Sequence, residues 1–151
     1  MAAAEAMLDE KHETLPNDVD DNNTYILGSI EQYYVVITCL PEGYYGTINA
    51  ASVLSNLKRS FPLIRAGLMV GIGGGVPSKI DVRLGDVIVG TRVMQYDLGK
   101  IIGDGEIRRT AIPRIPHQLL CTAVSALRTK HEREGTSITS ILEERFKQNS
   151  D

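Results

Sequence analysis

Aromatic residues and cysteine are scarce in this sequence. It contains no tryptophan, two phenylalanines and six tyrosines among 151 residues, and its two cysteines are Cys39 and Cys121. No C-x-x-C pair is present, which excludes the zinc and dithiol motifs that use this spacing. Because each cysteine stands inside an apolar run, we expect two buried free thiols in a reducing compartment.

Long apolar runs and an excess of positive charge are also missing. No run approaches the roughly eighteen apolar residues of a membrane-spanning helix, and residues 1–10 lack the basic and apolar regions of a signal peptide. Sixteen lysines and arginines stand against nineteen aspartates and glutamates, with no basic stripe, which argues against nucleic-acid binding. The three histidines are isolated and give no metal-ligand pattern. We therefore expect a cytoplasmic, metal-free domain without a membrane or nucleic-acid partner.

Four segments have the composition or spacing of helices. Apolar residues recur at steps of three and four over residues 48–61 and again over residues 119–133, which predicts two amphipathic helices. Residues 2–12 are rich in helix formers and predict a third. A capping box that begins at Ser140 predicts a short last helix.

Other segments are rich in β-branched and aromatic residues. Residues 24–30 and 33–40 predict a hairpin, and the second is apolar enough for a strand covered on both faces. Residues 66–72 and 85–96 predict two further strands, and residues 99–116 have the glycines and prolines of a loop. The order strand, strand, helix, strand, strand predicts an α/β fold of packed layers.

A glycine-rich segment within residues 68–86, LMVGIGGGVPSKIDVRLGD, is the most informative part of the sequence. Its three consecutive glycines leave backbone N–H groups open to close approach. The turn therefore either holds an anion or a flat base, or merely joins two strands. The spacing fits neither the dinucleotide-binding G-x-G-x-x-G motif nor the phosphate-binding G-x-x-x-x-G-K-[ST] motif.

The segment VGIGGGVP, followed by GDVIVG, resembles the nucleoside phosphorylase superfamily, which includes purine nucleoside and uridine phosphorylases and methylthioadenosine/adenosylhomocysteine nucleosidases. The resemblance extends to TYILGSIEQYYVVITCLPEG, GTINAASVLSNLKRSFP and QYDLGK. It is closest to the version found in fungal multidomain proteins that also carry NACHT, ankyrin or tetratricopeptide regions.

This resemblance implies a three-layer α/β/α fold with a mixed central sheet, incomplete at both ends, over residues 1–134, followed by a C-terminal tail over residues 135–151. It implies a domain that binds a purine nucleoside and cleaves its N-glycosidic bond, without a cofactor other than phosphate as a co-substrate, and that forms a homo-oligomer. The nucleoside-binding residues would be Gly71, Ile72, Gly73 and Gly74. The candidate pocket rim would be Gly43, Gly46, Thr47 and Asp97.

Two positions depart from the family's pattern and leave other functions open. Met69 stands where many phosphorylases carry a phosphate-binding arginine, and Ile72 stands where many carry a serine. The family's segments that grip ribose and protonate the base have no counterpart here, so no catalytic residue is assigned. The alternatives to an enzyme are a catalytically inactive sensor or oligomerisation domain and a fragment without a function of its own.

Overall fold

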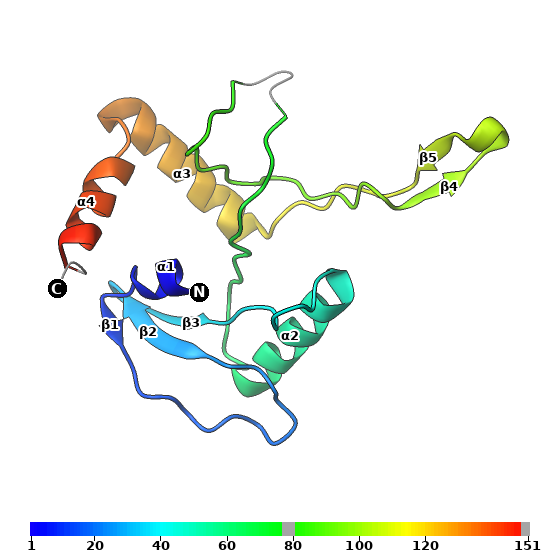
Figure 1. Ribbon diagram of the computed structural model, residues 1–151. Coiled ribbons are helices and arrows are strands. Elements are labelled where there is room, and N and C mark those ends of the chain that lie inside the picture. Colours follow the sequence, from blue (N-terminus) through cyan, green and yellow to red (C-terminus); the bar gives the residue numbers. More distant parts are fainter. Residues whose placement is uncertain (77–80, 149–151) are drawn as a thin grey trace. The chain divides into compact units, whose positions relative to one another are not determined.

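The structure is a computed structural model that describes residues 1–76 and 81–148, and it combines helices with antiparallel strands (Figure 1). The helices are α1 (Ala2–Glu5), α2 (Thr47–Ser60), α3 (Gln118–Glu134) and α4 (Ile138–Gln148), with a 3-10 turn at Gly103–Gly105. The strands are β1 (Glu10–Lys11), β2 (Ile26–Ile30), β3 (Tyr33–Ile37), β4 (Gly99–Ile101) and β5 (Ile107–Arg109). The chain divides into a first unit, Met1–Gly67 with Ile138–Asp151, and a second unit, Leu68–Ser137.

The first unit is built on a three-stranded antiparallel sheet with the order β1-β2-β3. The predicted hairpin is confirmed, because β2 and β3 pair from Ile26 opposite Ile37 to Ile30 opposite Tyr33. The expectation of a strand covered on both faces is wrong, because no residue of β3 is fully buried. The reason is that β3 has β2 as its strand partner and lies at an edge of this sheet.

Helix α2 confirms the predicted amphipathic helix of residues 48–61, and it supplies part of the small core of the first unit. Tyr25, Leu27 and Val53 are the buried apolar residues of the part of the chain that the structure describes. Phe61, directly after α2, packs edge-on against Tyr25 with ring centroids 4.9 Å apart. Phe61 therefore holds the end of α2 against the residue that leads into β2.

The N-terminal segment differs from the sequence expectation. Residues 2–12 do not form one helix: α1 has four residues, and the backbone from residue 9 onward pairs with β2 instead. The Asp9 N–H donates to the Ser29 carbonyl at 2.9 Å, and the His12 N–H donates to the Leu27 carbonyl at 2.8 Å. These hydrogen bonds to a neighbouring strand outweigh the helix propensity of the segment, because tertiary contacts routinely override propensity.

Helix α4 is joined to this N-terminal segment by an ion pair. The guanidinium of Arg145 contacts the Asp9 carboxylate, and it also donates to the Leu8 carbonyl at 3.5 Å. Hydrogen bonds from Arg145 and from the Glu31 backbone hold the pKa of Asp9 below its ordinary value. The expected capping box is wrong, since Ser140 lies inside α4 rather than at its start.

The second unit contains α3, which confirms the helix predicted at residues 119–133, and the hairpin of β4 and β5. The hairpin lies where the sequence predicts a loop, and Val93 forms an isolated bridge with Arg114 next to it. The strands predicted at residues 66–72 and 85–96 are absent apart from this bridge. A strand needs a partner for its backbone groups, and the described residues provide none for these two segments.

The two cysteines are less buried than their sequence context predicts. Cys39 is exposed because it lies beyond the last residue of β3, and Cys121 on α3 is half-buried. Both are free thiols. None of the described helices combines the length and the apolar character that crossing a membrane requires.

The close contact between β1 and β2 depends on Gly28. A Cβ atom at this position would meet the Glu10 carbonyl oxygen and would lie 2.6 Å from Cδ1 of Leu8. We expect Gly28→Ala to lower the free energy of unfolding by about 1–3 kcal/mol, the usual cost of overpacking. Chemical denaturation measures this, with Gly67→Ala as the control, because a Cβ at Gly67 meets nothing within 4 Å. Equal midpoints for the two variants would contradict the contact.

Candidate functional site

The predicted nucleoside-binding residues lie in an irregular, exposed segment of the second unit. Side chains added at Gly71, Gly73 or Gly74 would meet nothing within 4 Å, and Ile72 is fully exposed. Only Gly75 has a close neighbour, since its Cβ would lie 2.8 Å from Cγ1 of Val82. Pro77, the last residue of the motif, lies outside the described residues. As far as residues 1–76 and 81–148 are concerned, the segment thus offers open backbone without enclosing walls.

The predicted rim residues divide between the two units. Gly43 and Gly46 have φ angles of +79° and +94° in the first unit, so each adopts a left-handed conformation that favours glycine. Gly46 directly precedes α2, and Thr47 is the first residue of that helix. Asp97 is an exposed turn residue before β4 in the second unit. The turn conformation itself accounts for the two glycines.

The structure instead forms a polar cluster around Asp21, which lies in the loop before β2. Asp21 is buried, and its carboxylate accepts hydrogen bonds from the hydroxyls of Tyr25, at 2.7 Å, and Ser60. It also accepts the Asn23 backbone N–H at 2.9 Å. The Asn23 side-chain amide donates to the Tyr25 hydroxyl at 2.8 Å and to the Val53 carbonyl at 2.9 Å. These bonds fasten the loop before β2 to helix α2.

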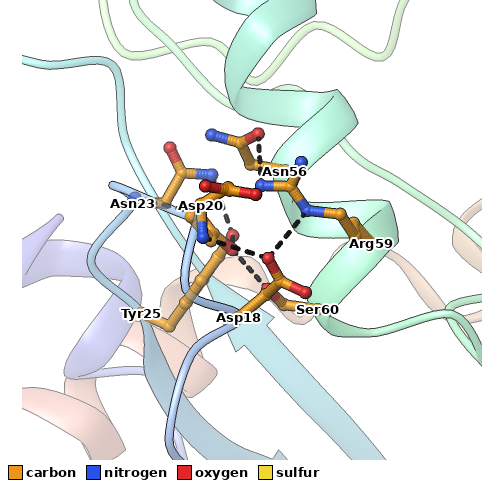
Figure 2. A network of polar contacts seen from close by, with 8 residues as sticks. Asp18, Asp20, Asn23, Tyr25, Asn56, Arg59 and Ser60 are labelled. Atoms are coloured by element: carbon orange, nitrogen blue, oxygen red, sulfur yellow. Dashed lines mark hydrogen bonds and ion pairs between the residues drawn. The ribbon is translucent and has the colours of Figure 1, made fainter.

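A second, more exposed contact lies beside this cluster. Nε of Arg59 is 3.3 Å from Oδ1 of Asp18, and the Arg59 guanidinium donates to the Asn56 side chain at 3.3 Å (Figure 2). The Asp18 carboxylate also accepts the backbone N–H of Asp20 at 3.1 Å. Since Arg59 is adjacent to Ser60, one end of α2 supplies both a cation and a hydroxyl to the aspartate-rich loop.

The surroundings of Asp21 fix the protonation states of the cluster. Burial has the largest single effect and raises the pKa of Asp21, but the hydrogen bonds from Ser60, Tyr25 and Asn23, with the charge of Arg59, together lower it below the ordinary value. Burial, followed by the hydrogen bond to Asp21, raises the pKa of Tyr25. The cluster therefore holds an ionised carboxylate and a neutral phenol at neutral pH.

This arrangement is suited to holding structure rather than to catalysis. The acceptor sites of Asp21 already receive three donors from the protein, and the hydroxyls of Tyr25 and Ser60 are both committed to it. A general base needs a free acceptor that can approach the substrate. The sequence did not predict this cluster, because Ser60 is 39 positions from Asp21. The one local indication was the spacing of Asp21, Asn23 and Tyr25, three polar side chains at every second position before β2.

Two cavities border the first unit's sheet, and neither is lined by the predicted site residues. One, of about 330 Å³, lies beside the Asp21 cluster. Its walls are Thr14, Leu15, Asn17, Asn23, Thr24, Tyr25, Leu27 and Phe61. The other, of about 480 Å³, is lined by Glu10, His12, Ser29, Glu31, Gln32, Tyr33 and Tyr34. Within residues 1–76 and 81–148, no group of three or more histidines, cysteines or carboxylates could hold a metal ion.

Comparison with known proteins gives a curated relative that is much longer than this chain. The chain is 44% identical over 159 aligned positions to a "Nucleotide-binding leucine-rich repeat (NLR)-like protein" of Hyaloscypha variabilis. The alignment includes the whole of this chain but only 16% of that relative. No family model matches the chain. No solved structure matches it.

These findings overturn the resemblance to the nucleoside phosphorylase superfamily. Neither a family model nor a solved structure supports it, and the relative that matches is described as an NLR-like protein. The physical reason for the error lies in the central motif of the resemblance, which was interpreted as a glycine run at the end of a strand. The structure forms no strand before these glycines, and a glycine run without that context fits many kinds of turn.

The Asp21 cluster predicts an acid-dependent loss of stability. Because folding lowers the pKa of Asp21, its ionised carboxylate stabilises the folded state. This stabilisation is complete above about pH 3.9, the ordinary pKa of an unfolded aspartate, and is lost as the pH falls through the lower pKa of the folded state. We expect Asp21→Asn to lower the free energy of unfolding by about 1–3 kcal/mol at neutral pH. The difference from the parent should shrink in acid.

Denaturant titrations at several pH values measure this difference. The control is Asp20→Asn, which makes the same change of charge at an exposed residue of the same loop and should cost little. A pH-independent difference between the parent and Asp21→Asn would show that the carboxylate charge is not what stabilises the loop.

Proposed function

We propose that the chain is a non-catalytic oligomerisation module of an NLR-like protein. The observation that carries this proposal is the exposure of the apolar residues in the second unit, and the matched relative supports the protein class. The large apolar residues concerned are 53% exposed or more. They are Leu68, Met69, Val70, Ile72, Leu84, Val87, Ile88 and Val89.

Leaving this apolar surface in water is costly. Each such side chain gains about 1.5–3 kcal/mol when it is buried, and large contiguous apolar patches mark interaction sites on folded proteins. Residues 66–72 and 87–89 carry no charge, so copies that meet through them bring no like charges together. Association that covers these residues is therefore strongly favoured.

The same association supports a layered fold. Residues 66–72 and 85–96 have strand-forming sequences. We propose that both become strands of a mixed sheet with helices on either face once further polypeptide pairs with them. A three-layer α/β/α arrangement is then a property of the assembled protein.

A charged substitution in the apolar segment tests the oligomerisation module. Val70 is 85% exposed, and burying an aspartate there without a partner is costly. We expect the parent chain to self-associate in a concentration-dependent way, and Val70→Asp to weaken association by at least tenfold, which corresponds to about 1.4 kcal/mol. Sedimentation velocity over a wide concentration range measures both chains.

Val19→Asp is the matched control, since Val19 is 98% exposed in the polar loop of the first unit. It should associate like the parent. A parent chain that stays monomeric at every concentration, or a Val70→Asp chain that associates as the parent does, would refute the oligomerisation module.

A second candidate function is recognition of a purine nucleoside by the glycine-rich segment, without cleavage. The observation that favours it is the open backbone at Gly71, Gly73 and Gly74, where no side chain blocks a flat ligand. Met69 and Ile72 supply no phosphate-binding group, which favours binding over phosphorolysis. The relative's name includes nucleotide binding, and this supports a ligand of related chemistry.

Thermal unfolding with excess adenosine tests the second candidate. A ligand at a hundredfold excess over its Kd stabilises the folded form by about 2.7 kcal/mol. Gly73→Val should abolish the shift, whereas Gly90→Val, at another open glycine of the same unit, should keep it. Release of free base, with and without phosphate, should be undetectable. No shift for the parent chain would exclude this candidate.

A further inference from the structure

The outer edge of β3 is an unpaired row of backbone groups. In the described part of the chain the sheet order is β1-β2-β3, so one side of β3 has no strand beside it. Ser29 and Leu27 direct their carbonyls to the β1 side of β2, and hydrogen-bonding direction alternates along an antiparallel strand. Their partners on β3, Tyr34 and Val36, therefore direct their N–H and C=O groups to the open edge.

The two edges of this sheet differ in how well they resist further pairing. The β1 edge has only two residues, and both are charged. The β3 edge has five residues, YYVVI, without a charge or a proline. Short strands, charges and prolines are the usual means by which proteins protect a sheet edge, so β3 is the edge that accepts another strand.

We propose that β3 pairs antiparallel with β3 of a second copy of this chain, with Val35 opposite Val35 of that copy. This inference rests on the proposed self-association and names one surface that performs it. Tyr34 and Val36 of each copy then lie opposite Val36 and Tyr34 of the other. Each of the four residues contributes one N–H and one C=O, which gives four N–H···O bonds across the two-fold axis.

Charge and side-chain pairing favour a second copy as the occupant. Like charges directly opposite one another destabilise a pair of strands. Because β3 carries no charge, pairing with a second copy of itself places no like charges opposite one another. In this register Tyr33 lies opposite Ile37, and Tyr34 lies opposite Val36. Aromatic residues opposite β-branched residues are favourable cross-strand pairs. Tyr33 and Tyr34 are 63% and 87% exposed, so the pairing also covers two rings that are now in water.

A disulfide cross-link tests the register. Val35→Cys, in a chain that also carries Cys39→Ser and Cys121→Ser, places two thiols directly opposite each other at a spacing that a disulfide can bridge. We expect mild oxidation to give mainly a covalent dimer that a reducing agent separates. Tyr33→Cys in the same background is the control, because residue 33 of one copy lies opposite residue 37 of the other. Equal cross-linking of the two variants, or none for Val35→Cys, would overturn the register.

Sedimentation velocity of Val35→Lys separates this inference from the proposed function. Two lysines opposite each other repel, so we expect association at least tenfold weaker than for the parent, whereas Val35→Thr keeps the shape and the association. If the parent and Val35→Lys associate equally, the β3 contact is wrong and self-association through the apolar segment stands. If the parent is monomeric, self-association itself fails, and the β3 contact fails with it.

Discussion

The ionised carboxylate of Asp21 joins the parts of the first unit. It accepts hydrogen bonds from the loop before β2, from Tyr25 and from Ser60 at the end of α2. Around it the core is small, with Tyr25, Leu27 and Val53 as its buried apolar residues. A buried charge is tolerated only when its hydrogen bonds are made, so the need to satisfy this one group constrains both the position of α2 and the path of the loop.

The described residues of the second unit form no comparable centre. Its helix α3 has no buried residue, and its hairpin of β4 and β5 is exposed throughout. The apolar residues of its glycine-rich segment are in water as well. The described residues therefore form a small core in the first unit and none in the second, and much apolar surface stays in water. This is the surface that the proposed association covers.

Local patterns predicted local structure well. The spacing of apolar residues predicted α2 and α3, and the β-branched runs predicted the hairpin of β2 and β3, because each element is stabilised by residues close in sequence. Residues 2–12, 66–72 and 85–96 were predicted wrongly. In residues 2–12, part of the backbone pairs with β2 instead of forming a helix. For residues 66–72 and 85–96, no partner strand is present among the described residues.

For the candidate site, too, local features were predictable from the sequence and contacts between distant segments were not. The sequence by itself determined where glycines leave the backbone open, since a missing Cβ is a property of the residue. It also determined which runs are uncharged and strand-forming. Only the tertiary structure decided that Asp21 meets Ser60 across 39 positions. It alone also decided that, among the described residues, β3 lies at a sheet edge and nothing encloses Gly71 to Gly74. Those outcomes depend on which distant segments meet, and residue spacing alone carries no information about that.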